Sequence, residues 1–257
     1  GQGFEQSKHE PCLFSLRCGD EVIIVGIYVD DIIVAHRGRK LFETFKSSFL
    51  TRFRAKHIGP LQWFLGMEVD QHSDYSIDIS QKAFIEKIVK KYIPHNNVTR
   101  THPTHDLFNK LGSAKSDLER AEVHDFPYMS VVGALLYASV MCRPDISFHT
   151  SVLAKFMADP SPDCCKAATH LLQYLGSTAD RKIHFSGQCS VPDGLQKSGP
   201  DILRNHGFVA YSDSSWGNEY PYPMFGYCIC MFGGLISFAS KQLKTVAFSS
   251  CEAEYAA

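Results

Sequence analysis

The sequence has no arrangement of cysteines that predicts a metal site or a disulfide framework. Nine cysteines are scattered through 257 residues, and none of them belongs to a CxxC pair. The closest spacings are Cys164–Cys165 and Cys228–Cys230, and no paired histidine motif completes a zinc site at either of them. We therefore expect reduced thiols in an intracellular protein.

The sequence also has no long apolar segment. The longest candidate, Glu21 to Ala35, is shorter than the ~20 residues that cross a bilayer, and Asp30 and Asp31 interrupt it. The chain opens at Gly1 without an initiator methionine and without a basic and apolar leader, which is typical of a fragment or a processed product. These absences predict no membrane partner.

The sequence has no large excess of charge of either sign, because 26 basic residues balance 27 acidic ones and the formal net charge is −1. The basic residues are nonetheless clustered. The segment from Arg37 to Lys56 has seven of them and a single acid, Glu43, and four more lysines follow between Lys82 and Lys91. Such a stripe either neutralises nucleic-acid phosphates or forms an ordinary solvated helix face, and the sequence leaves both interpretations open.

Hydrophobic patterning predicts a mixture of strands and helices. Val, Ile and Tyr dominate Glu21 to His36, which favours two strands that meet at a polar pair. Apolar residues at helical spacing follow from Leu41 to Phe53, and Ser80 is positioned to cap a further helix. The other predicted segments are a hairpin over 63–79, linkers over 96–125 and 186–206, helices over 127–175 interrupted at two prolines, strands from Gly207 with a turn at Gly233-Gly234, and a short helix from Ser250.

The sharpest signal is the tetrapeptide YVDD, Tyr28 to Asp31, between two β-rich arms. Adjacent carboxylates repel each other, and either water at a hairpin tip or a bound cation offsets the repulsion. Mg2+ offsets the repulsion better than water does, because it binds carboxylate oxygens and substrate phosphates together. Neighbouring side chains on a strand point to opposite faces, so Asp30 and Asp31 reach one ion only where a tight turn bends the chain. A solvated hairpin tip and a metal site both fit this pattern.

YVDD with these flanks resembles the palm signature of reverse transcriptases, and the chain as a whole resembles the Pol polyprotein of copia-type retrotransposons. The run GFEQSKHEPCLF before the signature and the motifs VVGALLYA and CRPDI, between Val131 and Ile146, are typical of the copia branch. The resemblance implies that Asp30 is the main metal ligand and Asp31 a supporting one. It also implies that a third Asp from an earlier strand joins them to hold two Mg2+ ions, with Mn2+ as the alternative ion. These ions would activate the primer 3′ hydroxyl and stabilise the leaving pyrophosphate.

Two neighbouring segments extend the resemblance. The run GPLQWFLGMEV, Gly59 to Val69, resembles the primer-grip hairpin, although its two aromatic residues are equally well explained as core residues. The run from Ile79 to Tyr92 resembles the start of the thumb. The nucleic-acid contacts that the resemblance implies are Tyr28, Trp63, Phe64, Gly66, Lys87 and Lys90.

A second pattern of acids lies in the tail. The apolar run from Phe208 predicts a strand that ends near Asp213, and Ser249-x-x-Glu252 matches a capping box at the start of a helix. At about 100° per residue, Glu254 lies roughly 200° around the helix from Glu252, so Glu252 can cap while Glu254 faces the sheet. Asp213 and Glu254 are therefore candidate partners at a metal, and two ordinary surface acids are the alternative.

The tail resembles the amino-terminal part of a copia-type ribonuclease H, whose first two acids match Asp213 and Glu254. The resemblance implies two-metal hydrolysis of the RNA strand in RNA–DNA hybrids. The remaining acids of that enzyme would lie beyond Ala257.

The fold class implied by the resemblance is α+β. It comprises a reverse transcriptase palm and thumb start over residues 1–103, a mainly helical connection over 104–205, and the start of a ribonuclease H-like mixed sheet over 206–257. The fingers and the first palm strand would precede Gly1. The implied partners are an RNA template, a DNA primer, the RNA–DNA hybrid and deoxynucleoside triphosphates. The implied setting is a cytoplasmic virus-like particle and the nucleus, where DNA integration of the transposable element takes place, and the oligomeric state stays open.

Some positions depart from the copia pattern, which usually has a His-Trp pair and several Arg in the region of Cys164, Cys165, His170 and Gln173. Lost positive charge weakens phosphate contacts. Three functions therefore stay open: part of an RNA-directed DNA polymerase with ribonuclease H, a catalytically dead remnant that binds nucleic acid, and an unrelated metal-dependent nuclease that uses Asp213 and Glu254 alone. Because one metal ligand is missing, we expect the isolated chain to be inactive as a polymerase. Because the fingers are absent, we expect it to bind primer–template weakly and in a salt-sensitive way.

Overall fold

The computed structural model describes residues 3–94, 101–102, 108, 110–187, 207–215, 224–243 and 249–256. The chain divides into two compact units, Gly1–Leu61 and Gln62–Ala257. Both units combine antiparallel sheets with helices, so the α+β class is confirmed at that level. None of the helices in the described part of the chain has the length and apolar character that a bilayer crossing requires.

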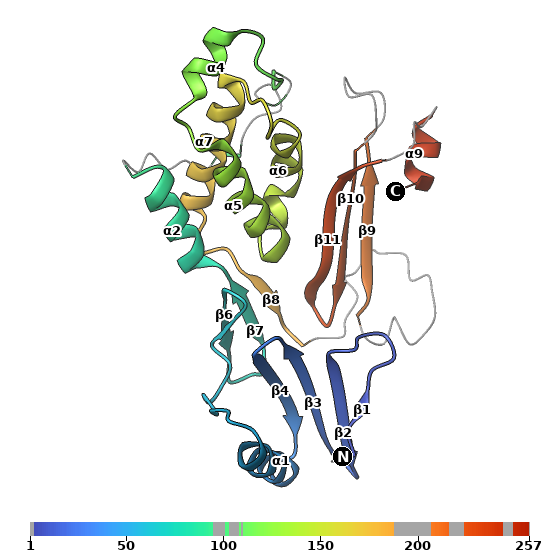
Figure 1. Cartoon of the computed structure of the whole chain (residues 1–257). Helices are drawn as coiled ribbons and strands as arrows, with labels where there is room; N and C mark the ends of the chain where they lie inside the picture. The colour runs from blue at the N-terminus through green and yellow to red at the C-terminus, as the bar shows by residue number, and fades with distance from the viewer. Residues whose placement is uncertain are drawn as a thin grey trace. The chain divides into compact units, whose positions relative to one another are not determined.

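The first unit is a four-stranded antiparallel sheet with one helix (Figure 1). The helix α1 (Arg39–Arg52) follows the last strand and packs against the third. The predicted strands over 21–36 and the predicted helix over 41–53 are confirmed. The strands, which neighbour one another in chain order, are β1 (Glu5–Gln6), β2 (Leu13–Cys18), β3 (Glu21–Tyr28) and β4 (Asp31–Arg37).

Helix α1 covers the face of this sheet that carries Ile23. Ile23 is fully buried, and its register partner His36 stacks on Phe42 of α1 with the ring centroids 4.1 Å apart. The carboxylate of Glu21 accepts a hydrogen bond from the backbone N–H of Leu41 (3.1 Å). The strand therefore supplies a cap for the helix, whose own N-cap residue makes no side-chain cap bond.

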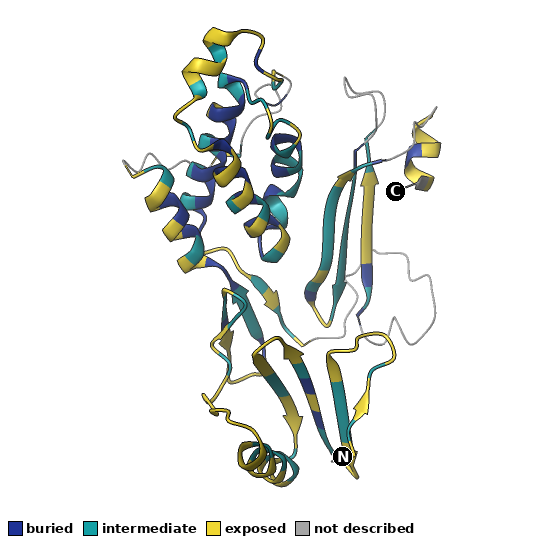
Figure 2. Ribbon diagram, viewed as in Figure 1, coloured by how far each residue is buried: buried dark blue, intermediate teal, exposed yellow. Residues whose placement is uncertain are grey.

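The second unit is built around a helical core. Figure 2 shows the buried faces of these helices turned toward one another. Side chains such as Ile85, Val131, Leu135 and Leu171 have no exposed surface, and burial of each contributes roughly 1.5–3 kcal/mol. The helices that pack together are α2 (Lys82–Tyr92), α5 (Tyr128–Met141), α6 (Ser147–Ala154) and α7 (Pro162–Ser177), with a short 3-10 turn, η1 (Pro144–Ile146), ahead of α6.

The helical region is divided at prolines, as the sequence predicts, because α5 ends before Pro144 and α7 begins after Pro160. The predicted linker over 96–125 is wrong in part. Helix α4 (Asp117–Val123) forms within it where the hydroxyl of Ser116 accepts a hydrogen bond from the N–H of Glu119 (3.2 Å), and Phe108 is buried in the helical core. The second predicted linker, 186–206, lies almost entirely outside the described residues.

A second antiparallel sheet joins segments that are far apart in the chain. Its strands, in spatial order, are β5 (Trp63–Phe64), β6 (Met67–Gln71), β7 (Ile77–Ser80) and β8 (Ile183–Phe185). Strand β8 follows the helices and pairs with β7, so residues on both sides of the predicted boundary at 103 share one sheet. The functional domain boundaries themselves stay a prediction.

The prediction that Ser80 caps α2 is wrong. The carboxylate of Glu68 on β6 accepts the hydrogen bond from the N–H of Ala83 (2.7 Å), and the hydroxyl of Ser80 donates to the same carboxylate (3.3 Å). The capping group comes from a neighbouring strand, which local sequence does not reveal.

A third antiparallel sheet has the spatial order β11 (Gly234–Gln242), β10 (Met224–Met231) and β9 (Val209–Ser214), and it is followed by a short helix, α9 (Ser250–Ala256). The turn between β10 and β11 consists of Phe232 and Gly233, with φ of 53° and 73°, one residue earlier than predicted. The predicted strands after Gly207 and the predicted helix from Ser250 are confirmed.

Candidate functional site

The β3–β4 hairpin places the predicted acid pair at a two-residue turn. Tyr28 and Asp31 are register partners, and Val29 and Asp30 connect them. All four residues are exposed, Val29 at 83%. Val29 has a φ of 51°, which costs a β-branched residue roughly 1–3 kcal/mol; glycine usually occupies this position when only the first residue of the turn has positive φ. Backbone strain is therefore held at the tetrapeptide that the sequence singles out.

Tyr28 and Asp31 lie on the face of the sheet opposite to α1. Side chains alternate along a strand, so Tyr28, five residues after Ile23, points away from the helix. Asp31 precedes His36 by five residues and shares the face of Tyr28. Ile24 on that face is 41% exposed. Within the first unit, the acid-bearing face is therefore the open one.

The carboxylates of Asp30 and Asp31 are chemically suited to a hard cation. Neither forms an ion pair or a hydrogen bond with a residue that the structure describes. Carboxylate oxygens are the ligands that Mg2+ prefers, so the donor chemistry fits that ion. No group of three or more His, Cys, Asp or Glu side chains comes together as a metal site in the described part of the chain. A cation bound by this pair would therefore need a further ligand.

The β5–β6 hairpin is anchored by Tyr137, a residue that the sequence argument did not assign. Leu65 and Gly66 form the turn of this hairpin, with φ of 51° and 75°. The Tyr137 hydroxyl, on α5, donates a hydrogen bond to the carbonyl of Leu65 (2.8 Å). A Cβ at Gly66 would lie 2.7 Å from the same hydroxyl oxygen. The Tyr137 ring also meets Phe84 of α2 edge-on, with centroids 4.9 Å apart.

The predicted nucleic-acid contacts of this region lie at the surface. Trp63 is 57% exposed, which does not fit a core position, whereas Phe64 is half-buried. Lys87 and Lys90 are exposed on α2, whose buried side includes Ile88. Their contacts with nucleic acid stay a prediction.

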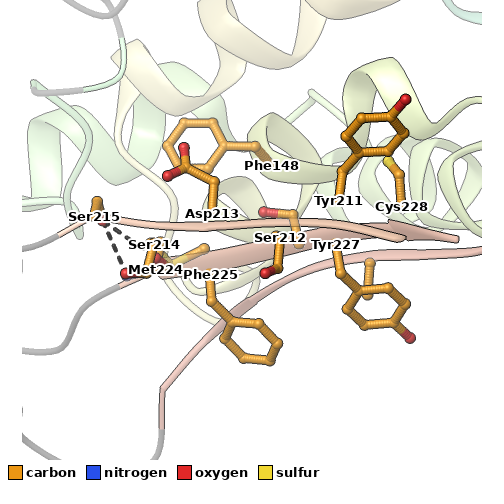
Figure 3. Close-up of a pocket in the computed structure, with 13 residues that line it drawn as sticks. Phe148, Tyr211, Ser212, Asp213, Ser214, Ser215, Met224, Phe225, Tyr227 and Cys228 are labelled. Atoms are coloured by element: carbon orange, nitrogen blue, oxygen red, sulfur yellow. Dashed lines mark hydrogen bonds between the residues drawn. The ribbon is translucent and has the colours of Figure 1, made fainter. Parts of the chain in front are cut away.

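Asp213 lies on the wall of a cavity of about 440 Å3. The residue is exposed on β9, and its register partner on β10 is Gly226. Figure 3 shows the Asp213 carboxylate directed toward Phe148 of α6, with Tyr211 and Cys228 on the same side of the sheet. The cavity is therefore lined by one carboxylate together with aromatic and small side chains.

Glu254 is exposed on α9 and does not line the cavity of Asp213. Ala253 is the buried residue of this helix, which contacts β9. The hydroxyl of Ser249 accepts a hydrogen bond from the N–H of Glu252 (3.1 Å), so the capping role of Ser249 is confirmed. The joint role of Asp213 and Glu254 as metal ligands stays a prediction.

A buried electrostatic network surrounds Arg143, in the motif CRPDI. Arg143 is 1% exposed; its guanidinium donates two hydrogen bonds to the carboxylate of Asp145 (2.8 and 2.7 Å) and two to oxygens of Thr178 (3.0 and 2.7 Å). Tyr174 and Arg181 donate to the same carboxylate (2.9 and 3.0 Å). Burial works to raise the pKa of Asp145, but the hydrogen bond and charge of Arg143, with Tyr174 and Arg181, outweigh it and lower the pKa. The network ties η1 to α7 and holds the helical core together.

The cysteines in the region that departs from the copia pattern pack inside this core. Cys164 and Cys165 on α7 are buried, and the Cys164 thiol donates to the carbonyl of Gly112 (3.3 Å). Burial, with smaller effects of Cys164 and Glu122, raises the pKa of the Cys165 thiol to about 11. The Cys165 thiol therefore stays protonated, and both side chains fill the core.

Comparison with known proteins identifies the chain. The family described as "Reverse transcriptase (RNA-dependent DNA polymerase)" matches residues 1–106, which include both hairpins. The retrovirus-related Pol polyprotein from transposon TNT 1-94 of Nicotiana tabacum is 29% identical over 260 residues, which cover 100% of this chain and 18% of that protein. The chain belongs to the copia-type retrotransposon reverse transcriptase family.

Two further relatives of this copia-type reverse transcriptase chain differ in length. The retrovirus-related Pol polyprotein from transposon RE1 of Arabidopsis thaliana is 30% identical over 257 residues, 98% of this chain and 16% of that protein. The putative transposon Ty5-1 protein of Saccharomyces cerevisiae is 27% identical over 259 residues, 98% of this chain and 77% of that protein. The chain thus spans less than a fifth of the tobacco and Arabidopsis polyproteins. No solved structure matches it significantly.

Proposed function

We propose that this chain is the palm and thumb-start portion of a retrotransposon RNA-directed DNA polymerase, followed by a helical connection and the start of a ribonuclease H. One observation carries the proposal. Asp30 and Asp31 sit at a strained turn, and Asp31 faces the open side of a sheet whose other side is covered by α1, within the residues that match the reverse transcriptase family.

In this proposal Asp30 and Asp31 hold Mg2+, or Mn2+, together with a third Asp from another segment. When bound, the ions supply activation of the primer 3′ hydroxyl and neutralisation of the leaving pyrophosphate. The chain itself positions the nucleic acid. Tyr28 lies beside the acids, the β5–β6 hairpin contacts the primer strand through Trp63, Phe64 and Gly66, and Lys87 and Lys90 neutralise phosphates of the hybrid.

A chimera in which this chain replaces the matching segment of the tobacco polyprotein tests the polymerase assignment. We expect Mg2+-dependent extension of a DNA primer on an RNA template, and we expect Asp30→Asn to abolish it because a metal ligand is lost. The control is Asp125→Asn, which changes an exposed acid outside both candidate sites. Equal extension by the chimera and its Asp30→Asn variant would refute the assignment.

We extend the proposal to the third sheet, with Asp213 and Glu254 as the first two acids of a ribonuclease H site that hydrolyses RNA in RNA–DNA hybrids. The cavity beside Asp213 supports this role. In the same chimera, Asp213→Asn and Glu254→Gln should each abolish cleavage of the hybrid and leave primer extension intact. Unchanged cleavage in either variant would remove that residue from the site.

A non-catalytic remnant that binds nucleic acid is the second candidate. The described residues hold no third metal ligand, and this chain covers 77% of the yeast Ty5-1 relative, so a polypeptide of similar size exists apart from a long polyprotein. A chimera that binds primer–template but does not extend it with either Mg2+ or Mn2+ would favour the remnant.

The partners in this proposal are the RNA template, the DNA primer, their hybrid and deoxynucleoside triphosphates. The proposed setting is a cytoplasmic virus-like particle and then the nucleus. Co-sedimentation of the chain with element RNA in particle fractions tests the setting, and a chain found only apart from such particles would contradict it.

A further inference from the structure

We infer that α1 and the coil after it bind single-stranded nucleic acid at a second site, on the face of the first sheet opposite to the acid pair. The inference deepens the proposed function, since it rests on this chain belonging to a nucleic-acid enzyme. It does not depend on metal binding by Asp30 and Asp31.

The first argument is the concentration of charge. The segment from Arg37 to Lys56 has seven basic residues and one acid and therefore a net charge of +6. The whole chain is −1, so the rest of the chain carries −7. A surface of this kind attracts a polyanion even though the protein as a whole is nearly neutral.

Most of this charge is not neutralised by the protein. Lys46 pairs with Glu43, and Arg37 donates two hydrogen bonds to the carbonyl of Asp20 (3.0 and 2.8 Å). The remaining five basic residues are exposed and have no carboxylate of a described residue within ion-pair distance. They are Arg39, Lys40, Arg52, Arg54 and Lys56.

The start of α1 keeps positive charge against the preference of the helix. Arg39 and Lys40 occupy the first turn, which has no acidic residue. The helix dipole disfavours each such charge. The carboxylate of Glu21, which accepts from Leu41, offsets part of this cost. An ordinary solvated helix gains nothing from this placement, whereas a phosphate-binding helix does.

An exposed aromatic ring at the end of α1 favours a single strand over a duplex. Phe53 is 51% exposed, and the guanidinium of Arg52 lies 6.0 Å from its ring centroid. Phe49 packs against this ring, with the two ring centroids 4.7 Å apart. An unpaired base can stack on such a ring, whereas the bases of a duplex are already stacked inside it.

The geometry of the sheet separates this surface from the acid pair. α1 packs on the face of Ile23, whereas Tyr28 and Asp31 project from the other face. The 14 residues of α1 span about 21 Å, so a strand along the helix runs behind the sheet. The site therefore suits an unpaired stretch of template away from the primer terminus.

Binding of fluorescein-labelled 20-nucleotide oligo(U) and oligo(dT) to the full 257-residue chain tests the inference. EDTA is present throughout, so that metal-dependent binding does not contribute. Single-strand binding falls with salt by about 0.7 log units of affinity per log unit of salt for each phosphate contact. The variant Arg39→Gln/Lys40→Gln/Arg52→Gln/Arg54→Gln should therefore lower this slope by about 3. Phe53→Ala should weaken binding about fivefold or more at constant slope.

The control variant removes four exposed lysines elsewhere and so makes the same change in net charge: Lys110→Gln/Lys115→Gln/Lys166→Gln/Lys241→Gln. An unchanged salt slope in the α1 variant, or an equal loss of salt slope in the control variant, would overturn the inference. Tighter binding of the chain to phosphatidylserine vesicles than to either oligonucleotide would also overturn it. Ultraviolet cross-links should map to residues 39–58, and cross-links confined to other segments would contradict it. Circular dichroism checks that each variant folds. Failure of the proposed polymerase function would show separately, as absent Mg2+-dependent extension by the chimera.

Discussion

Replacement of Gly66 by alanine tests how the β5–β6 hairpin is held on the helical core. The new Cβ would lie 2.7 Å from the Tyr137 hydroxyl oxygen, and Gly66 has a φ of 75°. Alanine at such a φ costs about 1–2 kcal/mol. In addition, either the contact with the oxygen is too close or the Tyr137 ring moves and loses its hydrogen bond to Leu65.

The Tyr137→Phe exchange isolates the second effect. It removes the hydrogen bond, worth about 0.5–1.5 kcal/mol, and keeps the ring that contacts Phe84. With the oxygen gone, the nearest Tyr137 atom to the new Cβ at Gly66 is the ring carbon Cζ at 3.8 Å, an ordinary contact. Gly66→Ala should therefore cost less in the Tyr137→Phe background, and the two exchanges should couple by at least 0.5 kcal/mol, about the smallest value expected for the hydrogen bond.

The assay is urea unfolding followed by tryptophan fluorescence in a Trp216→Phe background, which leaves Trp63, on the hairpin itself, as the single tryptophan. Tyr75→Phe, at a residue that is 91% exposed, replaces Tyr137→Phe in a control cycle and should be additive with Gly66→Ala. Additivity of Gly66→Ala and Tyr137→Phe within about 0.3 kcal/mol would refute the anchoring argument.

Three further predictions concern the second unit. Arg143→Met should lower the free energy of unfolding by roughly 3 kcal/mol. This is the lower end of the range for a broken buried ion pair, because Asp145 retains its hydrogen bonds from Arg181 and Tyr174. A change below about 1 kcal/mol in urea unfolding would contradict this expectation. Because the pKa of Asp145 is lowered on folding, its contribution to the free energy of unfolding is complete above its ordinary pKa of 3.8 and is lost as the pH falls below that value. Asp145→Asn should therefore flatten the dependence of stability on pH between pH 5 and pH 2. An unchanged pH dependence would argue against this role of Asp145. Gln81→Met should raise the free energy of unfolding by about 1–3 kcal/mol. Gln81 is 1% exposed, and neither polar atom of its side-chain amide has a hydrogen-bond partner among the described residues. A destabilised variant would show that the amide does form hydrogen bonds.

Local patterns predicted most of the elements because their causes are local. The strands around the acid pair follow from Val and Ile runs, and the helix from Leu41 follows from apolar residues at helical spacing. Prediction failed where a partner comes from elsewhere in the chain. Glu68 caps α2 from a neighbouring strand, and Phe108 is buried from within a segment whose composition is that of a linker.

Residue types and short-range spacing were enough to predict the acid pair, its placement in a hairpin and the resemblance to reverse transcriptases, because these features depend only on a few neighbouring positions. The packed fold was needed to show that Tyr28 and Asp31 face away from α1 and that Tyr137 holds the turn at Leu65, 72 residues earlier. Such contacts depend on how distant segments pack, and the free energy that selects them is shared among many side chains.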